Sequence, residues 1–250
     1  MTDLIFAGNW KMHHGPTAAR ALIDAFLSSY EPYDDREVWF FPPAVSLTEV
    51  TRAIRGQTGL RSGAQNVYWE EKGAFTGESS VSMVRDAGAH VALVGHSERR
   101  HVFGETDTQT AKKVAAVLEG GLRPVLCVGE LLEEREAGHT EAVVLRQLAA
   151  ALAGVTGNSW GRIVVAYEPV WAIGTGKHAT PADAAAVHHT IRDWCAQQGA
   201  PSRMPILYGG SVKPANVEEL VAEEEIDGVL VGGASIDVES WRAITKVGLD

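Results

Sequence analysis

The amino-acid sequence predicts an α/β fold, a single (β/α)8 barrel with eight parallel strands. Eight short apolar or β-branched runs alternate with longer amphipathic stretches, and strands that alternate with helices pair in parallel through right-handed crossovers. The chain has 250 residues, which is the usual size of one closed barrel of this kind. No linker or low-complexity segment interrupts the series, so we expect residues 1–250 to form one domain.

The expected strands are short and mostly apolar, as strands buried on both faces are. They cover residues 4–7, 38–41, 60–64, 91–94, 125–128, 163–167, 206–208 and 229–231. Helix-like stretches lie between them, among others at residues 17–30, 106–118, 142–152, 181–198 and 214–224. An open doubly wound sheet is the main alternative. It would favour a dinucleotide fingerprint after the first strand, and Gly8-Asn9-Trp10-Lys11 does not supply one.

Composition excludes several classes of partner. The chain carries 22 Lys and Arg against 32 Asp and Glu, a formal net charge of −10, which argues against nucleic acid or an anionic membrane as partner. No apolar run approaches the roughly 20 residues of a membrane span, and no N-terminal stretch has a signal-peptide pattern. Cys127 and Cys195 are expected to be buried thiols in a reducing compartment. We therefore expect a cytoplasmic protein.

The segment after residues 163–167 combines an ionisable group with a plausible lid. Glu168 would lie at the carboxyl end of this strand, Pro169 prevents further strand pairing, and two glycines free the far end of the loop. A closing loop beside a carboxylate can exclude water from proton chemistry. The expected lid consists of Pro169, Val170, Trp171, Ala172, Ile173, Gly174, Thr175, Gly176 and Lys177. The alternative is a surface glutamate before an ordinary turn.

Other polar residues follow other strands, and the carboxyl ends of barrel strands converge on one mouth. Asn9 and Lys11 follow the first strand. An ammonium there could stabilise an oxyanion, form a Schiff base, or simply be solvated. His96 follows the fourth strand at a helix start, where the positive helix end favours a neutral imidazole; an isolated histidine could equally be part of the core. Glu98 and Arg99 are expected to form a structural ion pair or to orient other groups.

Two glycine turns on adjacent strands indicate an anion site. Gly209-Gly210-Ser211 and Gly232-Gly233 follow the last two strands, and each precedes a helical start. Glycine lets backbone N–H groups approach an oxygen closely, and barrels commonly hold phosphate in these two loops. Two tight turns without a ligand are the alternative. His188-His189 has no neighbouring Cys or carboxylate cluster, so we expect no metal site.

Several of these segments together resemble the triosephosphate isomerase family. The resemblance runs in order from the first strand to the last. It rests on residues 8–12, 63–66, 73–78, 94–100, 104–107, 127–130, 167–177 and 208–212. The family fold is the TIM barrel, in agreement with the strand count. The resemblance implies an aldose–ketose isomerase that interconverts glyceraldehyde 3-phosphate and dihydroxyacetone phosphate without a metal or an organic cofactor.

The resemblance also implies roles for individual residues. Glu168 would move a proton between two carbons, neutral His96 would polarise the carbonyl, and Lys11 would stabilise the enediolate with help from Asn9. This division of roles is a known property of the family, not a consequence of spacing in this chain. Ser97, Glu98 and Arg99 would support these groups. The substrate would bind through Asn9, Lys11, Gly174, Ser211, Gly232 and Gly233.

Residues 65–78 form a long, glycine-rich loop with three aromatic residues, which favours a partner surface. In the family this loop docks into a second subunit, so the resemblance implies a homodimer with Thr76 and Glu78 at the interface. An Ω-like loop packed on its own barrel is the alternative. Two other functions stay open at this point, because fold alone does not fix function: a Schiff-base aldolase that uses Lys11, and a noncatalytic barrel that binds phosphate ligands.

Overall fold

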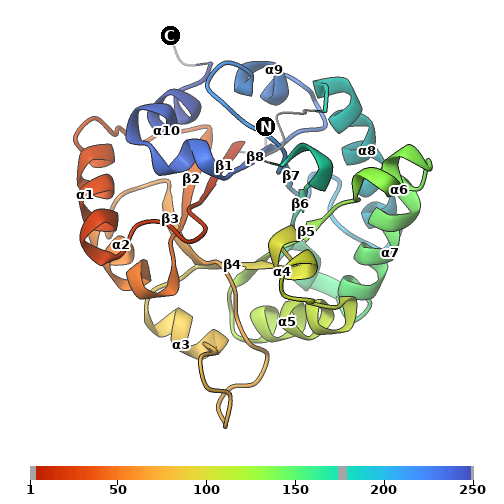
Figure 1. The fold of residues 1–250 in the computed structure, drawn as a ribbon, viewed down its shortest axis with the longest axis horizontal. Coiled ribbons are helices and arrows are strands. Elements are labelled where there is room, and N and C mark those ends of the chain that lie inside the picture. The colour runs from red at the N-terminus through yellow and green to blue at the C-terminus, as the bar shows by residue number, and fades with distance from the viewer. Residues whose placement is uncertain (1–3, 174–178, 249–250) are drawn as a thin grey trace.

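Eight parallel strands close into a barrel in the computed structural model, which describes residues 4–173 and 179–248 (Figure 1). Neighbouring strands follow the order of the sequence, and β1 pairs with both β2 and β8. The strands are β1 (Leu4–Asn9), β2 (Arg36–Phe41), β3 (Leu60–Ala64), β4 (Val91–Val94), β5 (Arg123–Val128), β6 (Val164–Tyr167), β7 (Ile206–Tyr208) and β8 (Gly228–Val231). The predicted eight-stranded barrel is confirmed.

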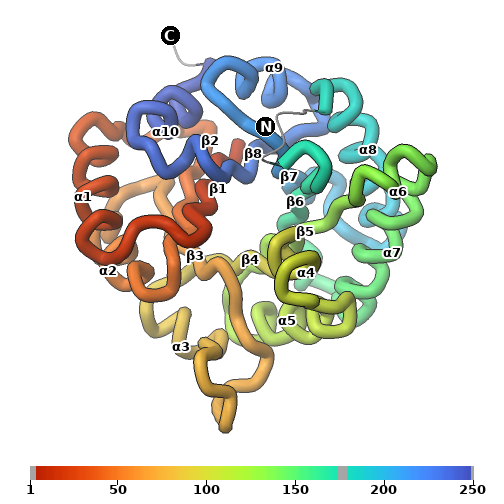
Figure 2. The backbone as a smooth tube through the Cα atoms, in the orientation of Figure 1, coloured from red at the N-terminus to blue at the C-terminus, as the bar shows by residue number. Residues whose placement is uncertain are grey.

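Helices form an outer ring around the strands, as the tube view also shows (Figure 2). In the described residues they are α1 (Pro16–Leu27), α2 (Leu47–Ala53), α3 (Val81–Asp86), α4 (Ser97–His101), α5 (Asp107–Glu119), α6 (Leu132–Glu136), α7 (Thr140–Leu152), α8 (Pro181–Gln197), α9 (Val217–Val221) and α10 (Val238–Thr245). Short 3-10 turns occur at η1 (Ala44–Ser46), η2 (Gly157–Arg162), η3 (Val170–Ala172) and η4 (Gly233–Ile236). Within these described ranges, none of the helices has both the length and the apolar character needed to cross a membrane.

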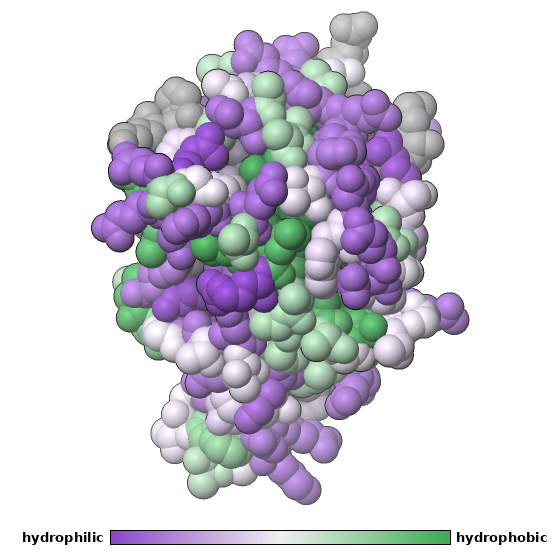
Figure 3. Space-filling model, turned by 90° about the vertical axis from the view of Figure 1, so that its right-hand side faces the viewer, coloured by the Kyte–Doolittle hydropathy of each residue, from purple (hydrophilic) through white to green (hydrophobic). Residues whose placement is uncertain are grey.

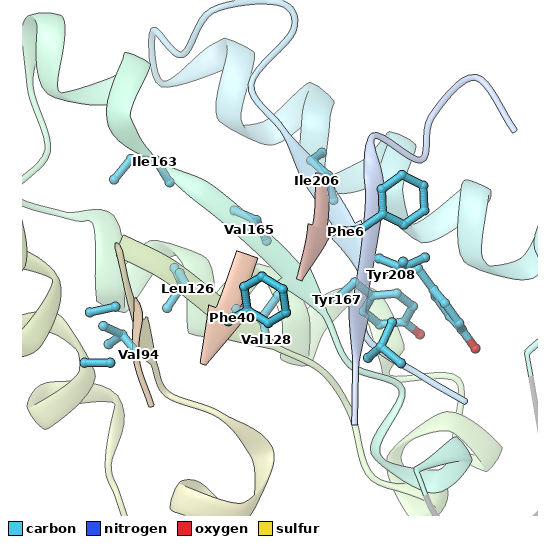
Figure 4. Packing of buried hydrophobic residues seen from close by; sticks show 14 of the residues in the cluster. Phe6, Phe40, Val94, Leu126, Val128, Ile163, Val165, Tyr167, Ile206 and Tyr208 are labelled. Carbon is cyan, nitrogen blue, oxygen red and sulfur yellow. The ribbon is translucent and has the colours of Figure 1, made fainter. Parts of the chain in front are cut away.

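The core has two layers because side chains alternate along each strand. One set fills the barrel interior and includes Trp39, Leu93 and Val125, all of them almost fully buried. The other set faces the helices and includes Phe6 and Tyr167; Figure 4 shows part of it. Helical side chains complete this outer layer, so burial on both faces explains why the strand sequences are nearly continuous in apolar residues.

Barrel closure requires one glycine. Gly228 begins β8 with φ of 143°, and a Cβ atom on it would lie 2.0 Å from the carbonyl oxygen of Ile5. Only glycine permits this backbone conformation and this approach. The register between β1 and β8, in which Ile5 faces Gly228, therefore depends on a residue without a side chain.

The main differences from the predicted elements are at their ends. Strands β2 and β5 start two residues earlier than predicted, at Arg36 and Arg123. The prediction missed these starts because charged residues occupy the first positions of both strands. The helix predicted at 214–224 is limited to Val217–Val221, since a turn occupies residues 214–216 and the Lys213 N–H donates to the side chain of Asn216. Cys127 and Cys195 are buried and unpaired, as predicted.

Candidate active site

A cavity of about 360 Å³ opens at the carboxyl ends of the strands. Four side chains predicted from separate parts of the sequence line it: Asn9, Lys11, His96 and Glu168. The glycine turns after β7 and β8 line its other side. Within the described ranges, the other residues that line it are Ile173, Gly209, Gly210, Ser211, Val212, Lys213, Leu230, Gly232, Gly233 and Ala234. The predicted convergence of these residues on one mouth is therefore present in the structure.

Glu168 is held at the floor of the mouth directly after β6. Its carboxylate accepts a hydrogen bond from the Ser97 backbone N–H at 2.8 Å and lies 3.0 Å from Nε2 of His96. Only 2% of the residue is exposed. Burial raises the pKa of Glu168, but His96 and the Ser97 amide outweigh burial, so the net pKa lies below its ordinary value. The carboxylate is therefore ionised at neutral pH, as a base must be.

His96 precedes the first turn of α4 and bridges Glu168 to this turn. Its Nδ1 accepts a hydrogen bond from the Glu98 backbone N–H at 3.2 Å, which leaves the proton of the neutral ring on Nε2, facing Glu168. Burial lowers the pKa of His96, but the adjacent Glu168 carboxylate raises it by more than burial lowers it. The net pKa of His96 is therefore above its ordinary value. The positive end of a helix was expected to lower the pKa of His96. The opposite direction is found because the Glu168 carboxylate lies in direct contact with the ring, nearer than the helix as a whole.

Lys11 projects into the mouth from a strained backbone conformation. Its φ of 50° is uncommon for a residue other than glycine, and such strain concentrates at functional sites. The Lys11 N–H donates to Oδ1 of Asn9 at 3.0 Å, and the amide of Gln65 donates to the Lys11 carbonyl at 2.8 Å. The ammonium lies 2.7 Å from a carboxylate oxygen of Glu98. Three neighbours thus fix the position of this cation.

Glu98 and Arg99 are not paired with each other in the described residues. Glu98 pairs with Lys11, whereas Arg99 pairs with Glu105 at 3.4 Å. Glu105 also accepts a short hydrogen bond of 2.5 Å from the buried Lys113. Glu98 and Arg99 therefore do not form the ion pair that was one expectation, because the first turn of α4 directs the two side chains toward different elements. The contacts of each with another residue agree with the other expectation, that they orient neighbouring groups.

Glycines leave the space that Glu168 occupies. A Cβ atom on Gly209 would lie 2.8 Å from Cγ of Glu168, and one on Gly129 would lie 1.7 Å from the Glu168 carbonyl oxygen. Real Cβ contacts are not this short, so larger residues here would displace the carboxylate. Gly209 was predicted as part of an anion turn. Its contact with Glu168 is a tertiary feature that spacing did not reveal.

The expected phosphate end of the mouth consists of backbone and one cation. Ser211, Gly232 and Gly233 all line the cavity, and the Lys11 side chain would be 3.2 Å from a Cβ on Gly232. The Ser235 hydroxyl donates to the Gly232 carbonyl at 2.7 Å, which holds this turn in place. Gly174, also expected to contact the substrate, lies outside the described residues.

The first part of the expected lid is anchored by a carboxylate that the sequence argument did not select. Glu130 is fully buried; it accepts from the Trp171 indole N–H at 2.8 Å and from the Tyr167 hydroxyl at 3.1 Å. The Val170 N–H donates to its backbone carbonyl at 3.1 Å. A glutamate two residues after a buried strand was the available signal. Gly174, Thr175, Gly176 and Lys177 of the lid lie outside the described residues.

The expected interface residues lie away from the mouth of their own barrel. Thr76 and Glu78 are exposed on the loop that projects beside α3, at the bottom of Figure 1 and of the side view in Figure 3. The loop base is closed by a bridge between Tyr68 and Ser80, and Tyr68 stacks on Trp69 with ring centroids 4.0 Å apart. The loop is therefore an ordered extension that does not pack its tip on its own barrel.

Comparison with known proteins agrees with the geometry of this mouth. The family model described as Triosephosphate isomerase matches residues 4–248. A triosephosphate isomerase of Roseiflexus castenholzii is 50% identical over 248 residues, which cover 98% of this chain and 97% of the relative. The Solibacter usitatus enzyme of the same name is 47% identical over 249 residues, covering 98% and 100% of the two chains. The chain therefore belongs to the triosephosphate isomerase family.

Proposed function

We propose that this protein is a triosephosphate isomerase that interconverts D-glyceraldehyde 3-phosphate and dihydroxyacetone phosphate. The observation that carries the proposal is the contact of an ionised, buried carboxylate with an imidazole in a cavity that also holds a fixed ammonium. Glu168, His96 and Lys11 are these three groups. A volume of about 360 Å³ is at the small end of ligand sites, which suits a three-carbon phosphate. The membership of the family supports the same reaction.

Glu168 is the base in this mechanism. Its carboxylate removes a proton from the carbon beside the substrate carbonyl and returns it to the neighbouring carbon, so that an enediolate forms between the two steps. The depressed pKa keeps the carboxylate ionised, and burial keeps bulk water away from it. These roles are the known roles of the family's glutamate and histidine. A positioned base contributes about 10²- to 10⁴-fold, so charge stabilisation must supply much of the remaining acceleration.

His96 acts as a neutral hydrogen-bond donor through Nε2. The Glu98 amide donates to Nδ1, and an imidazolium would carry a proton at that nitrogen, so the contact favours the neutral ring. The Glu168 carboxylate is the cause that raises the pKa of His96. When substrate lies between the two side chains, the effect of the Glu168 carboxylate on the pKa of His96 weakens. The Nε2–H group is then free to polarise the substrate carbonyl and to exchange protons with the substrate oxygens.

Lys11 and Asn9 stabilise the oxyanion, and the loops after β7 and β8 hold the phosphate through backbone N–H groups. Ser211, Gly232 and Gly233 supply this end, together with Gly174 of the lid. The net charge of −10 opposes binding of an anion, so the fixed ammonium has to compensate locally. Pro169 to Lys177 closes over the mouth, which excludes water and limits loss of phosphate from the enediolate.

A Schiff-base aldolase is less well supported. Its lysine must be free to attack a carbonyl, whereas Nζ of Lys11 is held in an ion pair with the Glu98 carboxylate at 2.7 Å. Borohydride trapping in the presence of substrate would detect an aldolase intermediate as a covalent adduct on Lys11. A noncatalytic phosphate-binding barrel would show no turnover of triose phosphates at all.

The decisive experiment is a coupled assay of triose phosphate interconversion on the wild type and Glu168→Gln together. We expect turnover in the wild type and a fall in kcat of about 10²- to 10⁴-fold in the variant. Ser159→Ala, which removes a half-buried hydroxyl outside the mouth, serves as a matched control and should keep full activity. Absence of turnover in the wild type would contradict the isomerase, and near-normal turnover of Glu168→Gln would contradict the role of Glu168.

We also propose a homodimer in which the loop of residues 65–78 docks into a partner subunit. Large apolar side chains are exposed around the loops that follow β1 to β4, and this is a common mark of an interface. They are Met12, Val45, Phe75, Met83, Val102 and Phe103. A second cavity of about 280 Å³ shares Asn9, Lys11 and His96 with the mouth and is also lined by Met12 and Phe103. This cavity suits the Thr76 tip of a partner loop.

Sedimentation equilibrium tests the dimer. We expect the wild type to sediment at twice the mass of the chain and Met12→Asp to dissociate, because a charge would be buried at the interface. Gln198→Asp, an equal charge change at an exposed position after α8, should remain dimeric. A monomeric wild type at micromolar concentration would contradict the proposal. We further propose that residues 1–250 are one catalytic domain and that the enzyme is cytoplasmic, which suits its two buried free thiols.

A further inference from the structure

A second large cavity lies at the opposite, amino-terminal end of the barrel. Its volume is about 710 Å³, roughly twice that of the mouth. It is formed where three helix-to-strand connections meet: α2 to β3, α3 to β4, and α5 to β5. Four arginines line it, Arg55, Arg61, Arg85 and Arg123, together with His90. Among the residues that the structure describes, no aspartate or glutamate lines this cavity.

Two of these arginines continue the register of the barrel interior at its amino-terminal end. Arg61 alternates with Gly63 on β3, and Arg123 alternates with Val125 on β5, in the register of the interior layer. The guanidinium carbon of Arg123 lies 5.3 Å from the ring centre of Trp39, a fully buried residue of that layer. The barrel thus ends here in a cationic surface backed by an aromatic ring.

Arg123 has no hydrogen-bond acceptor in the part of the chain that the structure describes, and its Nε is buried from solvent. Other buried or half-buried arginines differ. Arg36 donates to carbonyls of Thr245 and Val247, Arg162 to carbonyls of Leu118 and Leu122, and Arg192 to Asp227. Buried donors in folded proteins almost always have partners. The missing acceptor of Arg123 points to a group that comes from outside the chain.

Among the described side chains, Glu37 is the one carboxylate whose charge acts on Arg123, and it already accepts hydrogen bonds from other residues. Glu37 accepts from Arg61 at 2.6 and 2.7 Å and from the Trp39 indole at 2.7 Å. Burial lowers the pKa of Arg123, and the charges of Arg61 and Arg162 lower it further against the opposing effect of Glu37. Positive charge is thus in local excess, in a chain whose net charge is −10. An anion of two or more charges would relieve this repulsion.

We propose that this pocket binds a small multivalent oxyanion, a polyphosphate or polycarboxylate compound larger than a triose phosphate. Guanidinium groups present paired N–H donors that match the oxygens of phosphate and carboxylate. Arg123 supplies a half-buried guanidinium whose Nε has no acceptor among the described residues. Arg55 and Arg85 supply exposed guanidinium groups at the rim, although Arg85 also donates to the Gly120 carbonyl. The site is separate from the mouth, since the two cavities share no lining residue.

Calorimetric titration tests the proposal with two probes, inorganic tripolyphosphate and citrate. The full-length wild type is titrated in an equilibrated, saturating mixture of triose phosphates, so that the mouth is occupied. We expect one submillimolar site for at least one probe, with affinity that falls as salt increases. Binding of one probe alone decides whether the oxyanion is a phosphate or a carboxylate compound.

Variants separate this pocket from general charge. Arg123→Gln should weaken binding about tenfold or more, because it removes a buried charge-assisted donor. Arg55→Gln should weaken it about threefold; Arg55 is exposed and makes no ion pair within the described residues, so this variant keeps the fold. All of these changes should leave kcat for triose phosphates unchanged.

Arg20→Gln with Arg203→Gln removes two exposed charges elsewhere and should keep full affinity. No heat with the mouth occupied would overturn the proposal. Equal affinity of the wild type and the Arg55→Gln and Arg123→Gln double variant would overturn it too. Since catalysis is read separately, failure here would leave the isomerase assignment untouched.

Discussion

The two ends of the barrel use charged residues in opposite ways. At the carboxyl end, the ionisable groups contact one another across a cavity: Glu168 with His96, and Lys11 with Glu98. At the amino end, the Glu37 carboxylate accepts from both Arg61 and Trp39, and the neighbouring Arg123 has no acceptor among the residues that the structure describes. The same strands form both ends of the barrel. The difference in charge pairing therefore arises from the residues at the first and last positions of each strand.

The comparison separates reactivity from stability. Groups at the mouth are paired with partners that a substrate can replace, so changes there should affect rate more than folding. The Glu37–Arg61 pair at the amino end is static and partly buried, so changes there should affect folding more than rate. This is the usual division of a (β/α)8 barrel, in which conserved chemistry collects at the carboxyl face. Four predictions test it, in order of decreasing effect.

Shortening the base should have the largest effect. Glu168→Asp withdraws the carboxylate by one methylene, and a displacement of about 1 Å at a reacting group can cost about 10²-fold. We expect kcat to fall at least this much in the triose phosphate assay, while the melting temperature stays close to that of the wild type. If Glu168→Asp lost stability as strongly as it lost activity, residues at the carboxyl end would affect folding as much as rate, and the contrast with the amino end would be contradicted.

Gly209→Ala should act on the base without touching its chemistry. The added Cβ would lie 2.8 Å from Cγ of Glu168 and 3.2 Å from the Tyr167 carbonyl oxygen. We expect kcat to fall about 10- to 100-fold, with destabilisation of at most about 2 kcal/mol. Gly154→Ala is the control, because nothing lies within 4 Å of its Cβ position. Full activity of Gly209→Ala would show that Glu168 has more room than the structure gives it.

The pH dependence of stability should have a source outside both ends. His188 on α8 is fully buried, which lowers its pKa to about 4, and its ring packs against Tyr167. Between pH 6.5 and 4 the unfolded chain binds a proton that the folded chain does not, so stability falls as pH decreases through this window. We expect a loss of about 2 kcal/mol between pH 7.5 and pH 5 from this group.

Urea unfolding at the two pH values measures this loss. His188→Gln should reduce it, because glutamine does not titrate and can still donate to the Glu225 carbonyl. His189→Gln changes the exposed neighbour and should retain the fall in stability. If His188→Gln unfolds with the same pH dependence as the wild type, the titration belongs to other groups.

The smallest effect is expected from Glu37→Gln at the amino end. The change removes the charged acceptor of Arg61 while keeping the shape of the side chain. We expect destabilisation of about 1 kcal/mol in urea, since the pair is partly exposed, and unchanged kcat. The same variant should bind tripolyphosphate more tightly, because it removes the one carboxylate that acts on Arg123 within the described ranges. A fall in kcat comparable to that of Gly209→Ala would remove the contrast between the two ends.

The sequence was most informative where local pattern and chemistry coincide. Alternation of apolar runs with amphipathic stretches predicted all eight strands, and Glu168 was found because a carboxylate ends a buried strand before a proline. Strand starts were less predictable: Arg36 and Arg123 were left out because charged residues do not resemble buried strand positions. The surroundings of both arginines come from distant parts of the chain. Arg36 donates to a backbone carbonyl of α10, and Arg123 lines the cavity at the amino end.

The sequence by itself determined the barrel, the family and the residues that end each strand, since periodicity and short motifs are local properties. Only the tertiary structure decided which of these residues meet. It paired Lys11 with Glu98 instead of Glu98 with Arg99, placed Gly209 against the base, and gave Glu130 its position beneath Trp171. Contacts of this kind depend on distances between separate strands, and no local pattern encodes those distances.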